Sequence, residues 1–341
     1  VGMVYHKKSN LQKAIFYLKI AAEINPISIE AQNNLANLYD ETGQHELAIK
    51  EYKKALRVDP NNVPTLYNLG QTYVGISSSS RAIESFLQAT QIEPSFTQAH
   101  QQLIKLYLKK ENYIGMLLHL KQLAKANPSD TDTQISIGQV YTKLKNFKLG
   151  IEILSQVKSR HPNNIKALEA LAETFYSAEN LDQAIIEYRN LLEQNPKHLP
   201  AYIQLGWIHY RRGEFQMATA STRRGLKLGI KSPQLTTFAN MNLGLYAWLE
   251  GDHSSAKKWY RDLLKEDSNT ILQGILNDLK KTALLFPKHI EAEFFSGWVY
   301  IEAGEKDKAT PHLSRFLALA PSGELADEAK ALLGRDLSLN F

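Results

Sequence analysis

The sequence predicts an all-α protein, an α-solenoid of stacked helix–turn–helix units that are 34 residues long. Three observations lead to this prediction: periodic prolines, small and aromatic residues at fixed places between them, and apolar residues spaced three, four and seven apart. The periodic prolines are Pro26, Pro60, Pro94, Pro128, Pro162 and Pro196. Six prolines in register out of twelve in the chain cannot be chance, so they define the unit.

Each unit is numbered here so that its proline is position 32. Position 8 then holds a small residue, position 11 an aromatic residue and position 20 an alanine in most units, as Gly70, Tyr73 and Ala82 do in the third. Small residues at positions 8 and 20 let the two helices of a unit approach closely, and large residues at 11 and 24 fill the space between units. One pair of helices cannot bury its apolar stripe alone, so neighbouring units must stack.

The expected helix ends agree with this division. The residue before the first helix of a unit is often a good N-cap; these residues are Ser28, Asn62, Asp130 and Asn164. Pro64 and Pro200 fall in a first turn, where proline is tolerated. Glycines fall in the turn between the two helices, where a positive φ costs glycine little; they are Gly43, Gly213, Gly251 and Gly304.

This pattern resembles the tetratricopeptide repeat, and the resemblance covers nearly the whole chain. It implies a right-handed superhelix whose concave groove is lined by the first helix of each repeat. In that family, positions 2, 5, 6, 9, 12 and 13 of the first helix face the groove. The resemblance does not supply a particular function, because the same fold serves many partners.

The repeats are expected to be regular over residues 1–230, with the first one truncated because Val1 falls at position 7. We therefore expect the chain to be a fragment of a longer protein. Residues 231–289 predict an irregular repeat followed by one extra helix over about 270–286. Residues 290–341 predict the last repeat and a polar capping helix. An odd helix predicts a bend or split between about 231 and 289; alternatively it pairs with an irregular partner and the stack continues.

The composition narrows the classes of function. The chain has no cysteine, which excludes disulfides and cysteine-ligated metals, and it has no phosphate-binding loop, dinucleotide motif, nucleophile elbow or metalloprotease motif. We therefore predict no enzyme, no metal and no cofactor. The formal charge of +5 is a mild excess without long basic blocks, so no nucleic-acid partner is expected. No run of 18 apolar residues occurs, so no membrane insertion is expected, and the compartment, cytoplasmic or periplasmic, stays open.

The early repeats carry amide side chains at the groove positions that the resemblance implies. An amide both donates and accepts hydrogen bonds, so a row of amides can hold a peptide backbone whatever its side chains are. The alternative is that these residues merely cover a wet surface. The candidate partner-binding residues are Asn33, Asn34, Asn37, Asn68, Gln71, Gln101 and Gln102, with Lys105 adding charge.

Two more specific resemblances concern the same positions. Asn34, Asn68 and Asn242 share position 6, which resembles the asparagine ladder in the repeat arm of O-GlcNAc transferases, although other residues interrupt it. Asn37 and Asn68 match the two asparagines of the chaperone-binding members. The basic residues of that carboxylate clamp are replaced here by Asn33, Gln98 and Gln102, so we do not expect binding of chaperone tails.

The later repeats carry large aromatic residues at the corresponding positions. Such residues dominate binding hot spots, because each buries much area at little cost in entropy. The alternative is that they pack against the extra helix or the cap. The candidates in this second predicted groove are Trp207, Tyr210, Trp248, Phe294 and Trp298.

The sequence thus predicts a scaffold that binds a peptide or protein partner in its concave groove. Two alternatives stay open: the non-catalytic repeat arm of a larger, transferase-like enzyme, and a cell-envelope assembly or secretion factor. Self-association through the repeat edges is also possible.

Overall fold

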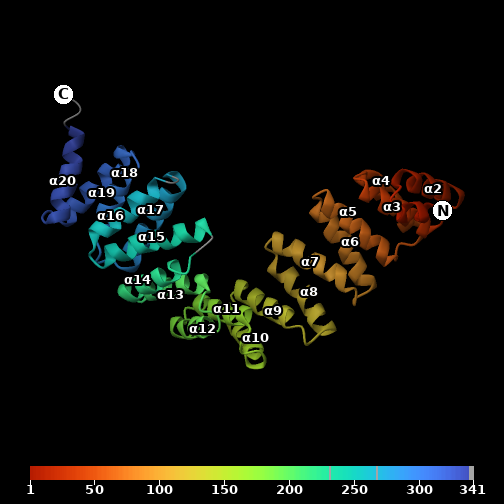
Figure 1. Cartoon of the computed structure of the whole chain (residues 1–341), viewed down its shortest axis with the longest axis horizontal. Coiled ribbons are helices and arrows are strands. Elements are labelled where there is room, and N and C mark those ends of the chain that lie inside the picture. Colours follow the sequence, from red (N-terminus) through yellow and green to blue (C-terminus); the bar gives the residue numbers. More distant parts are fainter. Residues whose placement is uncertain (230–231, 266–267, 338–341) are drawn as a thin grey trace. The chain divides into compact units, whose positions relative to one another are not determined.

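The computed structural model describes residues 1–229, 232–265 and 268–337, and within these ranges the chain is entirely helical, without strands (Figure 1). It forms two compact units, Val1–Pro162 and Asn163–Phe341. The helices of the first unit are α1 (Gly2–Lys7), α2 (Leu11–Ile24), α3 (Ile29–Glu41), α4 (His45–Val58), α5 (Val63–Gly75), α6 (Ser79–Ile92), α7 (Thr97–Lys109), α8 (Tyr113–Ala126), α9 (Thr131–Lys143) and α10 (Phe147–Arg160).

The second unit has ten helices in the described ranges. They are α11 (Ile165–Ser177), α12 (Leu181–Gln194), α13 (Leu199–Arg211), α14 (Phe215–Leu226), α15 (Pro233–Leu249), α16 (His253–Leu264), α17 (Ser268–Leu285), α18 (Glu291–Glu302), α19 (Lys306–Leu319) and α20 (Glu324–Leu337). Within each unit, consecutive helices pack as hairpins and each hairpin packs on the next, so the predicted α-solenoid class is confirmed.

The close approach of paired helices depends on the small residue at position 8. A Cβ atom added to Gly70 on α5 would lie 2.5 Å from the ring of Phe86 on α6. One added to Gly138 on α9 would lie 2.5 Å from the side chain of Leu154 on α10. Phe86 and Leu154 are both at position 24, so the small and large positions interlock as the periodicity predicts.

The predicted helix starts are confirmed. The side chains of Ser28, Asn62, Asp130 and Asn164 each accept a hydrogen bond from a backbone N–H of the helix that follows. Pro64 and Pro200 lie in the first turns of α5 and α13. These bonds satisfy backbone donors that the first turn of a helix leaves free.

The structure also contains a hydrogen bond between successive repeats that the sequence did not predict. The side chain at position 4 of a first helix donates to the carbonyl of the preceding position-32 proline. Gln32 Nε2 lies 2.5 Å from the Pro26 oxygen, and Tyr202 Oη lies 3.3 Å from that of Pro196. The proline therefore ends one repeat and also anchors the next, because its free carbonyl accepts the bond.

The turn between the two helices of a repeat has one residue of positive φ, at position 15. Gly43 and Gly213 have φ near +74° there, as predicted. Five other repeats hold a residue with a side chain at the same place, with φ between 53° and 60°: Ser9, Ser77, Glu111, Lys145 and Glu179. Each of these costs roughly 1 kcal/mol relative to glycine, because a Cβ atom crowds the backbone in this conformation.

The predicted extra helix is present as α17, and it belongs to the core of the second unit. Buried apolar residues between Tyr210 and Ala329 form one cluster, which includes Ile271, Ile275 and Leu279 of α17. The second unit is therefore not split at the irregular region. The predicted capping helix is α20, which buries Leu325, Ala326 and Ala329.

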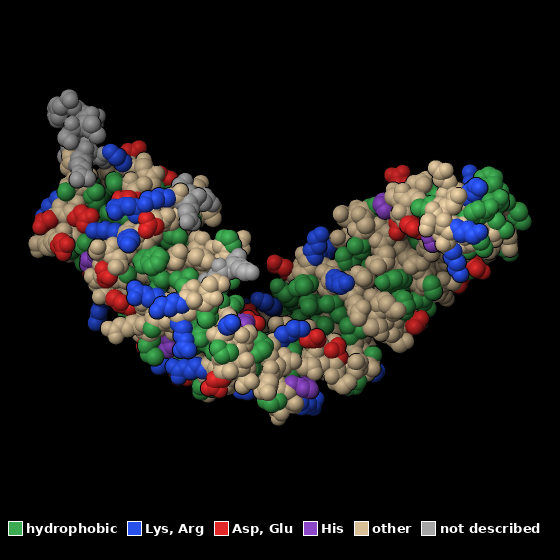
Figure 2. Space-filling model, in the orientation of Figure 1, with side chains coloured by type: hydrophobic (Ala, Val, Ile, Leu, Met, Phe, Trp, Pro, Cys, Tyr) green, Lys and Arg blue, Asp and Glu red, His purple; other side chains and the backbone are tan. Residues whose placement is uncertain are grey.

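The surface of the described residues mixes charges, and Figure 2 shows basic and acidic side chains interspersed over the visible face of both units. No described helix is both long enough and apolar enough to cross a membrane.

Candidate functional site

The eight polar candidates of the first unit lie on three first helices, α3, α5 and α7, and all of them are at least partly exposed. Asn37, Gln101 and Lys105 are exposed. We call this set the amide face; its residues are Asn33, Asn34, Asn37, Asn68, Gln71, Gln101, Gln102 and Lys105. Helix α3 contacts α5 directly, so amides of neighbouring repeats can meet.

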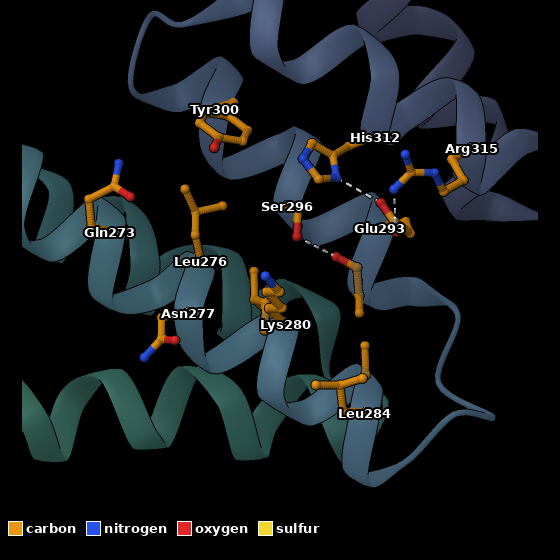
Figure 3. Close-up of a pocket in the computed structure, with 13 residues that line it drawn as sticks. Gln273, Leu276, Asn277, Lys280, Leu284, Glu293, Ser296, Tyr300, His312 and Arg315 are labelled. Atoms are coloured by element: carbon orange, nitrogen blue, oxygen red, sulfur yellow. Dashed lines mark hydrogen bonds and ion pairs between the residues drawn. The ribbon is translucent and has the colours of Figure 1, made fainter.

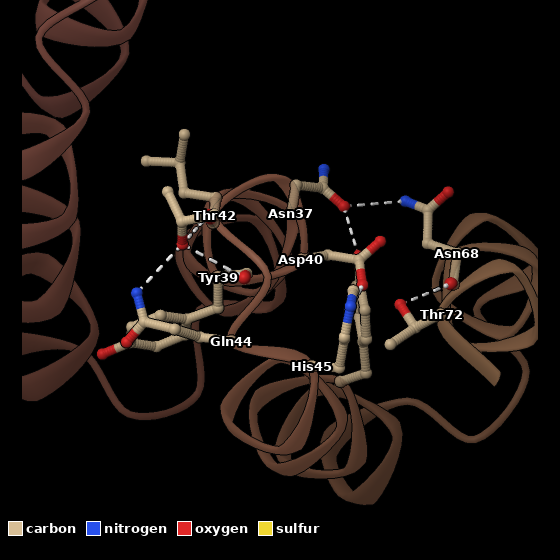
Figure 4. Close-up of polar contacts among 10 residues, drawn as sticks. Asn37, Tyr39, Asp40, Thr42, Gln44, His45, Asn68 and Thr72 are labelled. Carbon is tan, nitrogen blue, oxygen red and sulfur yellow. Dashed lines mark hydrogen bonds and ion pairs between the residues drawn. The ribbon is translucent and has the colours of Figure 1, made fainter. Parts of the chain in front are cut away.

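Asn37 and Asn68 form the centre of the amide face. Asn68 Nδ2 donates to Asn37 Oδ1 at 3.2 Å, and the phenol of Tyr52 donates to the same oxygen at 2.5 Å (Figure 4). These two bonds use both lone pairs of the Asn37 carbonyl. In the described part of the chain, the Asn37 amide nitrogen and the Asn68 side-chain oxygen have no such partner, so the pair offers one donor and one acceptor.

The phenol of Tyr52 fixes the orientation of Asn37 from the buried interior of the unit. It is buried on α4, and burial followed by the charge of Asp40 raises the pKa of Tyr52 far above its usual value. The phenol therefore keeps its proton and remains a donor. Asp40 is itself bonded to His45 Nδ1 at 2.8 Å. The orientation of Asn37 is thus set by a buried residue rather than by solvent.

Other members of the amide face are used within the fold. Asn33 Nδ2 donates to Thr65 Oγ1 at 2.6 Å, a bond that joins α3 to α5. Gln71 Nε2 donates to the phenol of Tyr67 at 3.2 Å. Asn33 therefore acts mainly as a tie between repeats, whereas no hydrogen bond holds the side chains of Gln101 and Gln102 among the described residues.

In the second unit, most of the aromatic residues that were predicted to line a groove are buried. Tyr210, Trp248, Phe294 and Trp298 are at most 2% exposed, and only Trp207 is partly accessible. A partner cannot reach the four buried rings. The prediction that they line an open binding surface is therefore wrong for these four rings, which lie in a hydrophobic core of the second unit.

Helix α17 is the physical reason for the burial of Tyr210. It has an apolar stripe that must be covered, and Tyr210 of α13 and Met241 of α15 cover part of it. Tyr210 Oη is bonded to Thr282 Oγ1 of α17 at 2.7 Å, and the ring of Tyr210 contacts Phe286 with centroids 5.6 Å apart. Met241 of α15 packs on Gly274. The extra helix thus covers Tyr210, whereas Phe294 packs on Phe316 of α19 and Arg261 of α16 lies over the ring of Trp298.

A cavity of about 600 Å³ lies among α17, α18 and α19 (Figure 3). Its central acid, Glu293, is bonded to His312 at 2.7 Å and to Arg315 at 3.0 Å. Burial alone would raise the pKa of Glu293. The hydrogen bonds from His312 and Arg315 outweigh burial, so the pKa lies below the usual value of a glutamate. The ionised Glu293 therefore compensates the charge of Arg315.

Similar cavities occur among α2, α3 and α4 and among α12, α13 and α14. All three are lined from the same repeat positions, such as position 11 at Tyr39, His209 and Tyr300. They are a packing feature of the repeat. Among the described residues, no group of three or more His, Asp or Glu could hold a metal ion.

Three sequence profiles of repeat families match parts of the chain. One described as TPR repeat matches residues 37–76. Two described as tetratricopeptide repeat match residues 169–233, and residues 63–96 with 239–270. No curated protein sequence matches the chain.

Solved structures resemble the chain in fold. The C-terminal part of a TPR repeat-containing protein from Cytophaga hutchinsonii is 16% identical and has a TM-score of 0.54, with 70% of this chain and 97% of that one covered. YrrB, a TPR protein with an unusual peptide-binding site, is 22% identical with a TM-score of 0.46, covering 54% and 95%. The human IFIT1 dimer with m7Gppp-AAAA is 14% identical with a TM-score of 0.49, covering 94% and 80%.

Proposed function

This chain is a tetratricopeptide repeat protein, and we propose that it is an interaction scaffold that binds an extended peptide segment of a partner protein along its amide face. The observation that carries the proposal is the Asn37–Asn68 pair, which joins two repeats and leaves one amide donor and one carbonyl acceptor accessible. An extended peptide presents backbone N–H and C=O groups that match this pair.

The setting of the pair supports specific binding. Tyr52 is 1% exposed and fixes Asn37 from the core, so little side-chain freedom is lost when a peptide binds. Gln101, Gln102 and Lys105 extend the polar surface by one further repeat. Since amides recognise backbone groups, the site should be tolerant of peptide sequence at these contacts.

The test uses peptides selected from a random display library on the intact chain. Their affinities are measured by calorimetry against the triple variant Asn34→Ala, Asn37→Ala, Asn68→Ala. Two or three lost hydrogen bonds should weaken binding roughly 10- to 100-fold. The unfolding midpoint should fall, because Asn37→Ala leaves the buried phenol of Tyr52 without its acceptor, but the variant should remain folded at the temperature of the binding measurement.

The matched control removes three exposed amides from second helices: Gln88→Ala, Gln91→Ala, Gln122→Ala. This variant should bind the selected peptides as the parent chain does. Peptides that bind the asparagine variant as tightly as the parent chain would exclude the amide face as the site.

A further inference from the structure

A group of lysines lies at the turns between first and second helices in the fourth and fifth repeats. We call it the basic edge; its residues are Lys109, Lys110, Lys145 and Lys148, and all are exposed. Between residues 105 and 160 the chain has ten Lys or Arg and four Asp or Glu. This segment therefore accounts for the whole positive excess of the chain, which is +5.

The same edge is neutralised elsewhere in the molecule. In the second unit, Arg211 at position 13 is bonded to Glu179 at position 15 of the preceding repeat, with 3.2 Å between the charged atoms. Arg212 at position 14 is bonded to Asp182 at position 18. In the sixth repeat, positions 15 and 18 therefore supply the acids that compensate basic residues of the seventh.

In the fifth repeat these two acid positions hold lysines, Lys145 and Lys148. Among the described residues, no acidic side chain pairs with Lys109, Lys145 or Lys148. Lys110 reaches only the hydroxyl of Ser80, at 3.3 Å. The basic edge thus holds lysines where the sixth repeat holds acids, and its positive charge has no acidic partner among the described residues.

The local backbone makes these lysines costly to keep. Lys148 lies in the first turn of α10, where the helix dipole disfavours a cation, and neither α8 nor α10 has an acid in its first turn. Lys145 has a φ of +59°, a conformation that glycine adopts in other repeats. Neither residue is explained by stability of the isolated chain.

Apolar side chains accompany the cations. Leu108, next to Lys109 at the end of α7, is 52% exposed, and Ile114 at the start of α8 is 74% exposed. The aromatic residues nearby, Tyr113 and Phe147, are partly buried. A surface that stacks nucleic-acid bases presents open aromatic rings among its cations, so this combination favours a protein ligand.

We propose that the basic edge binds an acidic segment of the partner, one with several Asp or Glu residues and interspersed aliphatic side chains. This inference rests on the proposed function and adds the chemistry of the partner. The acidic groups would compensate Lys109, Lys145 and Lys148, and the aliphatic groups would cover Leu108 and Ile114. Peptide backbone would continue onto the neighbouring amide face.

The test is fluorescence anisotropy with a labelled peptide of glutamates and interspersed leucines. A second peptide has glutamine in place of glutamate, and a single-stranded RNA oligonucleotide serves as the other anionic probe. The variant Lys109→Glu, Lys148→Glu reverses two charges of the basic edge. The control Lys125→Glu, Arg160→Glu reverses two exposed charges at the ends of the second helices α8 and α10.

The acidic peptide should bind the parent chain and the control equally, more weakly as salt rises, and about tenfold more weakly to the basic-edge variant. The glutamine peptide should not distinguish the variants. Equal binding of the acidic peptide to both variants, or no binding, would overturn the inference. So would RNA that binds more tightly than the acidic peptide and loses affinity in the same variant.

These outcomes separate the inference from the proposed function. If neutral selected peptides still depend on Asn37 and Asn68 while the acidic peptide ignores Lys109 and Lys148, only the basic edge is excluded. If the acidic peptide depends on the lysines while the asparagine variant binds selected peptides normally, only the amide face is excluded.

Discussion

At the scale of single residues, the buried pair His100 and His119 couples the first unit to pH. Their Nδ1 atoms lie 2.9 Å apart, and His100 Nε2 is bonded to the carbonyl oxygen of Pro94. If His100 donates through Nε2, its Nδ1 must accept a hydrogen from His119. Both rings are then neutral, and Nε2 of His119 is buried without a partner among the described residues.

Burial, and then the neighbouring His100, lower the pKa of His119 to about 4. In the unfolded chain, the His119 ring takes up a proton at a higher pH than in the folded chain. The free energy of unfolding should therefore decrease as pH falls from about 6.5 toward 4. The expected loss between pH 7.5 and pH 5 is about 2 kcal/mol. Hydrogen exchange of amides in α7 and α8 measures it locally.

The variant His119→Gln keeps a donor for His100 but has no titrating group. Its α7 and α8 amides should show a flatter dependence of opening free energy on pH. An unchanged slope in this variant would mean that another group carries the effect.

Position 15 supplies a second residue-scale prediction. Ser77 has a φ of +59°, so Ser77→Gly should stabilise the first unit by roughly 0.5–1 kcal/mol, because the crowding of Cβ is removed. The same change at Ser80, inside α6, should destabilise it, because glycine is a poor helix residue. Urea unfolding followed by circular dichroism compares the two, and changes of the same sign would contradict the account.

At the scale of elements, α17 is the feature that departs most from a regular repeat. This helix carries Asp278, whose side chain is largely buried in the second unit. Burial raises the pKa of Asp278 to about 6, although the positive charge of Lys281 acts to lower it. The carboxyl group of Asp278 therefore holds its proton more tightly in the folded state than in the unfolded state. Stability is highest at acidic pH and is lost as pH rises from about 4 through 6.

The variant Asp278→Asn should accordingly stabilise the second unit at pH 7.5 by roughly 2 kcal/mol, since no charge is then buried. All four tryptophans lie in this unit, so guanidinium unfolding followed by tryptophan fluorescence reports on it alone. The gain should vanish near pH 4. A gain that is equal at both pH values would show that ionisation is not its cause.

The elements also show what the sequence could and could not predict. Helix ends, the interlocking of Gly70 with Phe86, and the existence of the extra helix follow from local patterns, and all are found. The burial of Tyr210 and Trp248 was missed, because an apolar stripe shows that a helix needs cover but not which surface provides it. A polar residue at position 4, such as Gln32, was an unused signal for the bond to the preceding proline.

The amide face was predictable for a related reason. Asn37 and Asn68 lie at positions 9 and 6 of successive repeats, 31 residues apart, so the repeat places them on the neighbouring first helices α3 and α5. The role of Tyr52 beneath them was not predictable, because position 24 was expected only to fill space. Regular repeats therefore allow contacts between neighbours to be inferred, whereas contacts that depend on irregular elements need the structure.

At the scale of the whole molecule, the two units differ in what their first helices present. The first unit has an accessible row of amides followed by the basic edge, whereas the second unit buries four of its five candidate aromatic rings in its core. We therefore propose that a partner binds the first unit. The second unit contributes a core that is continuous through α20.

The most direct measurement is a crystal structure of the intact chain with one library-selected peptide. The account predicts an extended peptide with backbone atoms within hydrogen-bonding distance of the side chains of Asn37 and Asn68. A peptide bound only to second helices, or only to the second unit, would contradict it.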